Sequence, residues 1–114
     1  MHNVGLQERY QLLIGGQWKD ASDKKTFKTI CPADGSVLAE CAEATREDVD
    51  EAVKAAWKAF ESWKHVTVNE RAVILNKIAD IIDANQEHLA MVESLDNGKP
   101  IRETMAVDIP MSAQ

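Results

Sequence analysis

The chain has 114 residues, 45% hydrophobic and 28% charged, and its 13 basic and 19 acidic residues give a net charge of −6. This composition is ordinary for a globular domain or part of one, and an acidic chain without a basic stripe is a poor partner for nucleic acid or an anionic membrane surface. No apolar stretch approaches the roughly 20 residues that cross a bilayer, and MHNVGLQERYQ contains no run typical of a signal sequence. The predicted location is the cytoplasm.

Residues 1–44 are predicted to form short antiparallel strands. In LLIGGQW, residues 12–18, two apolar arms flank Gly15-Gly16, a pair that can take the positive φ angles of a hairpin turn. TFKTI (26–30) and SVLAECA (36–42) read as two further strands separated by a PADG turn. Period two places three residues on one face of the last strand: Val37, Ala39 and Cys41.

Residues 45–114 are predicted to be helical, because the hydrophobic period changes from two to 3.6 at Thr45. Capping boxes at Thr45 and Thr67 begin two helices. The apolar stripe of the first helix is Val49, Ala52, Val53, Ala56, Trp57 and Phe60, and that of the second is Ile74, Ile78, Ile81, Ile82, Leu89 and Val92. The second helix is predicted to reach Leu95, and the two helices are expected to pack as an antiparallel hairpin.

Part of a third helix is predicted after Gly98, a residue typical of the left-handed position that ends a helix. Pro100 can begin the third helix, and Pro110 interrupts or restarts it. The chain stops at MSAQ without a cap, which predicts a truncated chain. The fold class is therefore α+β, with short strands followed by two long helices and part of a third.

The sequence predicts no catalytic and no cofactor-binding residue. Neither GxGxxG nor GxxxxGK[ST] is present, so no phosphate loop can be placed. The three histidines (His2, His65 and His88) are scattered and are read as surface residues rather than ligands. Cys31 and Cys41 belong to no CxxC motif, so free packing residues are favoured over a disulfide. The aromatic stripe Trp57, Phe60 and Trp63 has helical spacing and is predicted to pack in a core rather than to form a ligand platform.

Asp96 is the one residue for which two readings compete. As a plain polar residue near a helix end it is misplaced by charge, because the C-terminus of a helix carries partial negative charge. A bound cation would reverse that penalty, since carboxylate and helix carbonyls could both face it. The residues alone favour a structural role of Asp96 near the helix end over a role as a cation ligand.

The combination of LIGGQW, the PADG turn, REDVDEAVKAAWKAFESW, ERAVILNKIADII and LDNGKPIRET closely resembles the start of NAD(P)-dependent aldehyde dehydrogenases. LDNGKPIRET followed by DIP is most similar to bacterial enzymes that act on acetaldehyde and other short aliphatic aldehydes. The resemblance implies that the segment belongs to the α/β nucleotide-binding domain of that fold. It also implies a homo-oligomer in the intact enzyme.

The resemblance further implies a structural K⁺ or Na⁺ site formed by main-chain oxygens of Thr29 and Ile30 and by Asp96. This sequence has Cys31 where the family usually has Asn, a departure at the edge of that site.

The implied activity is oxidation of an aldehyde to a carboxylic acid with NAD or NADP, through a cysteine thiolate and a Glu-activated water. Neither Cys31 nor Cys41 matches the nucleophile, and the family's Glu and nucleotide loop lie beyond position 114. The segment alone is therefore predicted to be inactive scaffold. The alternatives are a non-catalytic interaction or assembly module, and a related semialdehyde or acylating dehydrogenase.

Overall fold

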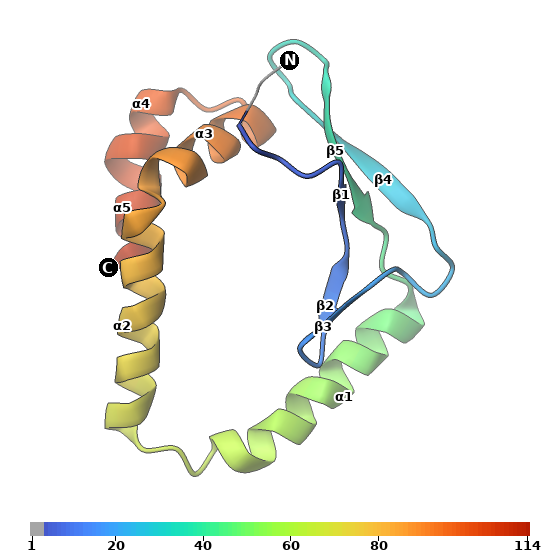
Figure 1. Ribbon diagram of the computed structural model, residues 1–114, viewed down its shortest axis with the longest axis vertical. Coiled ribbons are helices and arrows are strands. Elements are labelled where there is room, and N and C mark those ends of the chain that lie inside the picture. The colour runs from blue at the N-terminus through green and yellow to red at the C-terminus, as the bar shows by residue number, and fades with distance from the viewer. Residues whose placement is uncertain (1–3) are drawn as a thin grey trace. The chain divides into compact units, whose positions relative to one another are not determined.

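Two compact units make up the computed structural model, which describes residues 4–114 (Figure 1). The first unit contains Ile30–Leu38, Thr67–Gln114 and the segment that ends at Leu6. The second contains Gln7–Thr29 and Ala39–Val66. The division into residues 1–44 and 45–114 stays a prediction. No helix within residues 4–114 is long and apolar enough to cross a membrane.

The strands of the described chain form two small sheets. One sheet has the order β1-β5-β4 and the other pairs β2 with β3. The bounds are β1 Arg9–Tyr10, β2 Leu12–Ile14, β3 Gln17–Lys19, β4 Thr26–Ile30 and β5 Val37–Ala42. The strands predicted at 12–18, 26–30 and 36–42 are thereby confirmed.

The β2–β3 hairpin forms as its sequence predicts. The two strands are antiparallel, with Leu13 opposite Trp18. Gly15 and Gly16 have φ angles of 60° and 81°, the pair of positive values that a tight two-residue hairpin turn requires.

β1 is a strand that the sequence does not predict, and it is an exception to the predicted antiparallel pairing. This strand pairs with β5 in parallel, with Arg9 opposite Glu40 and Tyr10 opposite Cys41. Two residues are too few to show a period in the sequence, and the pairing joins segments about thirty residues apart. Burial along β5 also departs from period two, because Ala39 and Ala42 are buried while Val37 is 51% exposed.

Three longer helices and one composite helix follow the strands. They are α1 (Arg46–Trp63), α2 (Val68–Ala84) and α3 (Gln86–Asn97), and then α4 (Ile101–Glu103), the π-helical η1 (Thr104–Asp108) and α5 (Ile109–Ala113). α4, η1 and α5 run on without a break and together form the helix predicted after Gly98 (hereafter the third helix), which Pro110 does not end.

Both predicted capping boxes are present. At the start of α1, the Asp48 amide donates to the Thr45 hydroxyl (3.2 Å), and the Asp48 carboxylate accepts from the Thr45 amide (2.9 Å). The Ser22 amide donates to the same carboxylate, and Asp48 is only 2% exposed. The amide of Thr45, followed by that of Ser22, holds the pKa of Asp48 below its ordinary value.

The prediction of one long second helix reaching Leu95 is wrong. The helix breaks at Asn85, which has φ −115° and ψ 17° and separates α2 from α3. The Asn85 side chain donates to the carbonyl of Ile81 at 2.8 Å. An asparagine amide competes in this way for backbone groups, which explains why apolar periodicity alone missed the break.

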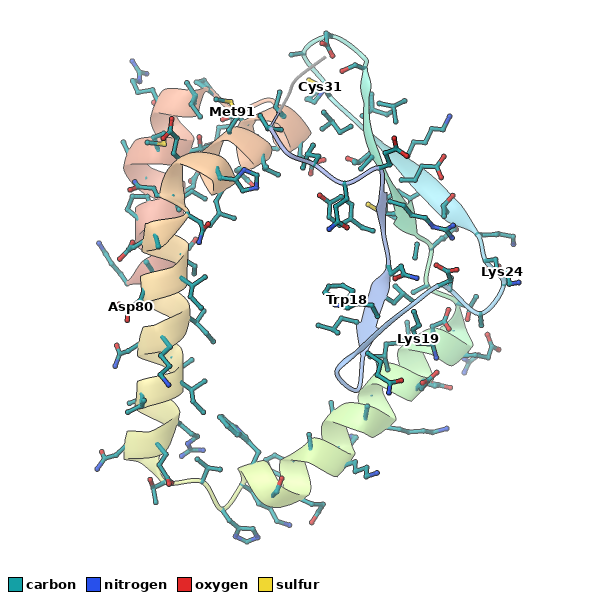
Figure 2. The ribbon with its side chains drawn as sticks, viewed as in Figure 1. Trp18, Lys19, Lys24, Cys31, Asp80 and Met91 are labelled. Atoms are coloured by element: carbon teal, nitrogen blue, oxygen red, sulfur yellow. The ribbon has the colours of Figure 1, made fainter. Side chains whose placement is uncertain are left out.

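The predicted antiparallel hairpin of the first two helices stays a prediction, because α1 and α2 belong to different compact units. α2 packs against α5 and α3, whereas α1 lies against β2 in the other compact unit (Figure 1). Lys19, labelled in Figure 2, reaches α1 and pairs with Glu51 at 2.6 Å. Both helices present apolar stripes, and their pattern does not specify which partner each stripe meets.

Few large side chains are buried within the described residues. The buried hydrophobic set is Ile14, Ala21, Cys31, Ala39, Ala42 and Ala90. The predicted core packing of the α1 aromatics is wrong, because Trp57, Phe60 and Trp63 are 64%, 46% and 40% exposed.

Candidate functional site

The turn that ends α3 carries Asp96, the predicted cation ligand. Asp96 lies in the last turn of the helix, is exposed, and precedes Gly98 by two residues. Gly98 has φ 80° and donates its amide to the Ser94 carbonyl at 3.0 Å, while Asn97 Oδ1 accepts from the Lys99 amide at 2.7 Å. The glycine prediction is confirmed, and this local geometry fixes the backbone that follows Asp96.

A contact within the first unit brings the turn after β4 beside the end of α3. A Cβ placed on Gly98 would lie 2.8 Å from Cγ of Pro32, closer than real contacts allow. Glycine is therefore required here both by its φ angle and by the approach of the proline ring. Ile30 and Cys31 immediately precede Pro32, so the polypeptide that carries one predicted main-chain ligand adjoins the turn that carries Asp96.

The donor set of the predicted site consists only of oxygen atoms. Ile30 and Asp96 belong to the first unit, whereas Thr29 is half-buried and is assigned to the second. Carbonyl and carboxylate oxygens suit a hard cation such as K⁺ or Na⁺. Within residues 4–114 no group of three or more His, Cys, Asp or Glu side chains could hold a metal ion, so transition-metal chemistry has no cluster there.

The Lys99 ammonium forms an ion pair with a carboxylate on η1. Its Nζ lies 2.8 Å from Oδ1 and 2.6 Å from Oδ2 of Asp108. The hydrogen bond goes to Oδ1, while the contact with the buried Oδ2 is electrostatic. The hydrogen bond to Asp108 raises the pKa of Lys99, so the ammonium stays protonated and ties the turn to η1. The sequence does not predict this pair, because its members are nine residues apart and lie on different elements.

The two cysteines are free thiols that differ in how far they are buried. Cys31, labelled in Figure 2, is a free thiol with 1% exposure, and Cys41 is a free, half-buried thiol. The free-thiol prediction is confirmed. Burial keeps Cys31 from meeting a substrate, and a reactive cysteine needs access and a charged neighbour. His65 and His88 are exposed as predicted, and His2 lies outside the described residues.

Thr104 is a second residue whose role the sequence does not predict. It is fully buried (0% exposed), and its hydroxyl donates to the Ala90 or Ile101 carbonyl, each 3.1 Å away. The Ser94 hydroxyl lies 2.9 Å from it. The only sequence signal near this site is Pro110, which marks a disturbed helix without revealing what compensates it.

An open apolar groove lies on α1 in the second unit. Its volume is about 360 Å³, and it is lined by Val53, Ala56, Trp57 and Phe60. The rings of Trp57 and Phe60 pack edge to face with centroids 5.8 Å apart. The groove offers mainly apolar contact area.

Comparisons with known proteins agree on one family. The sequence model of the aldehyde dehydrogenase family matches residues 18–114. The chain is 44% identical over 107 residues to aldehyde dehydrogenase B of Escherichia coli K12, and 44% identical over 109 residues to an aldehyde dehydrogenase of Deinococcus radiodurans. These alignments cover 94% and 96% of this chain and 21% of each relative, so the chain spans about a fifth of their length.

The fold is also similar to solved structures. An NAD-dependent aldehyde dehydrogenase from Sinorhizobium meliloti superposes with a TM-score of 0.90 at 37% identity. The superposition covers 99% of this chain and 23% of that one.

Proposed function

The chain belongs to the aldehyde dehydrogenase family, and we propose that it is a scaffold segment of an enzyme that oxidises an aldehyde to a carboxylic acid with NAD or NADP. The match over residues 18–114 is the observation that carries this proposal. In the fold of the solved relatives the segment would form part of the nucleotide-binding domain. The proposed substrates are acetaldehyde and other short aliphatic aldehydes.

The residues of this chain hold structure rather than perform the chemistry. The nicotinamide group, when bound, accepts a hydride from the aldehyde carbon. No Gly-rich phosphate loop occurs in the sequence, and Cys31 is buried, so we assign no residue of the chain to cofactor binding or to catalysis. Those groups would come from polypeptide outside these 114 residues.

The exposed apolar surface of α2 supports a scaffold role. Val68, Leu75 and Ile81 are 70%, 65% and 62% exposed, and no residue of this helix is buried. A helix with apolar residues around most of its circumference is usually buried in a larger protein. We infer that further polypeptide of the same enzyme covers α2.

An activity assay tests the proposal. The complete gene product that contains residues 1–114 is expected to reduce NAD or NADP with acetaldehyde, while the 114-residue chain alone is expected to show no turnover. Enzyme-like turnover by the chain alone would contradict the scaffold assignment. Inactivity of the complete product toward a panel of aldehydes would contradict the proposed reaction.

The second candidate function is a non-catalytic interaction module, favoured by the open groove that Trp57 and Phe60 line. Size-exclusion chromatography with light scattering distinguishes the two functions. A monomer with a cooperative thermal transition favours a self-sufficient module, whereas aggregation of the 114-residue chain favours the scaffold.

We propose that Ile30, Asp96 and Thr29 provide oxygen ligands for a structural K⁺ or Na⁺. The contact between Pro32 and Gly98 supports this site, because it joins the two segments that carry Ile30 and Asp96. The cation would steady the fold and take no part in the reaction.

Replacing Asp96 tests the cation site. In the complete gene product, Asp96→Asn is expected to weaken the rise in melting temperature that K⁺ gives over choline at equal ionic strength. Asp80→Asn is a matched control, since Asp80 is an exposed carboxylate on α2 (Figure 2). An Asp96 variant that responds to K⁺ as the parent does would leave this residue with only a structural role.

Cytoplasmic location and homo-oligomerisation remain predictions.

A further inference from the structure

Pro110 sits where the third helix needs a backbone donor. A proline has no amide hydrogen, so a regular α-helix would lose the bond from residue 110 to the carbonyl four residues earlier. In the structure, the segment before the proline is a π turn over Thr104–Asp108, in which the Ile109 amide donates to the Thr104 carbonyl. The backbone thereby closes a ring one residue larger than that of an α-helix.

This register leaves the Met105 carbonyl without a backbone donor. In an α-helix its donor would be the Ile109 amide, but that amide already donates to the Thr104 carbonyl. In a π-helix its donor would be residue 110, which is proline. Met105 is half-buried, and an unpaired carbonyl in such a place is costly.

The Gln86 side chain supplies the missing donor. Its Nε2 donates to the Met105 carbonyl at 2.8 Å. Gln86 is the first residue of α3, directly after the break at Asn85, so the break places this amide opposite the π turn. The bond therefore joins the start of α3 to the middle of the third helix.

We propose that Gln86, Pro110 and the π turn form one conformational lock, in which the Gln86 amide replaces the proline's missing N–H and fixes the third helix against α3. Thr104 adds a second contact between the same two elements, because its hydroxyl lies 3.1 Å from the Ala90 carbonyl and 2.9 Å from the Ser94 hydroxyl. The lock is independent of the proposed enzymatic activity.

A double-mutant cycle tests the lock. Gln86→Met removes the donor at similar volume, and in the complete gene product it is expected to lower the folding equilibrium constant about tenfold, an effect at the lower end of that of an unpaired acceptor because Met105 is half-buried. Pro110→Ala restores an amide at position 110 or lets Ile109 return to Met105. In that background Gln86→Met is expected to cost less than about threefold. Glu87→Met, an exposed change on the same helix, is the control.

The coupling free energy between Gln86 and Pro110 is measured by urea unfolding of the parent, the two single variants and the double variant. The proposed lock would be overturned if Gln86→Met lowered the stability equally in the parent and in the Pro110→Ala background. It would also be overturned if the Gln86→Met variant were no less stable than the Glu87→Met variant. If Gln86→Met prevents folding, recovery of a cooperative transition in the Pro110→Ala background supports the lock, and failure in both backgrounds overturns it.

Discussion

Replacing Thr104 by valine keeps the volume of the side chain and removes one buried hydroxyl. That hydroxyl lies 3.1 Å from each of two carbonyls, those of Ala90 and Ile101, and 2.9 Å from the Ser94 hydroxyl. A hydroxyl has a single proton, so Thr104 donates one hydrogen bond at a time and can accept another from Ser94. The substitution therefore removes two hydrogen bonds from a site that is 0% exposed.

The expected loss of stability follows from these two bonds. Each contributes roughly 0.5 to 1.5 kcal/mol net, so Thr104→Val should lower the free energy of unfolding by about 1 to 3 kcal/mol. The folding equilibrium constant then falls by about 5- to 150-fold. Thr104→Ser keeps the hydroxyl and loses only a methyl group, so it should retain most of the hydrogen-bonding contribution.

Urea denaturation of the complete gene product, followed by far-UV circular dichroism, measures the difference. The midpoint should fall in the order parent, Thr104→Ser, Thr104→Val. A valine variant as stable as the parent, or more stable than the serine variant, would refute the assignment of stability to the hydroxyl. Ser94→Ala combined with Thr104→Val should cost less than the sum of the single changes, because both remove the same bond.

Two further predictions concern the glycines and the helix cap. Gly35→Ala should cost about 1 kcal/mol of folding free energy, because its φ of 74° disfavours alanine although nothing lies within 4 Å. Gly98→Ala should cost more, because its Cβ would also meet Pro32; equal melting temperatures of the two variants would contradict the close approach. Asp48→Asn should destabilise the protein at pH 7. The pKa of Asp48 is lowered in the folded state, chiefly by the Thr45 amide, so its contribution is present above about pH 4 and is lost as the pH falls through the folded value. The difference between the urea midpoints of parent and variant should shrink as the pH falls below about 4, and a difference that does not change with pH would contradict the role of the charge.

Features that depend on neighbouring residues could be predicted from the sequence. The Gly15-Gly16 turn and the Thr45 and Thr67 capping boxes each need only a few consecutive residues to form their bonds. The left-handed Gly98 follows from the same kind of local rule. The family could also be inferred from the sequence, because LDNGKP and its companion segments form a specific combination.

The candidate site could be predicted only in part. The family resemblance identifies Asp96 as a candidate cation ligand, but it does not predict the contacts around the turn that carries Asp96. The approach of Pro32 to Gly98 and the ion pair between Lys99 and Asp108 join residues on different elements. No periodicity in one segment encodes such contacts.

Tertiary structure decided where the helices and strands meet. The sequence by itself determined most of the segments that become strands or helices, the capping boxes that begin α1 and α2 and the glycine that ends α3, because those choices are governed by dihedral preference and hydrogen bonds within a few residues. Only the folded chain decided that β1 pairs in parallel with β5, that α2 packs on α5, and that Gln86 satisfies a carbonyl left open by Pro110. An apolar stripe or an unpaired carbonyl accepts any partner of suitable shape, and the competition among those partners is resolved only when distant segments come together.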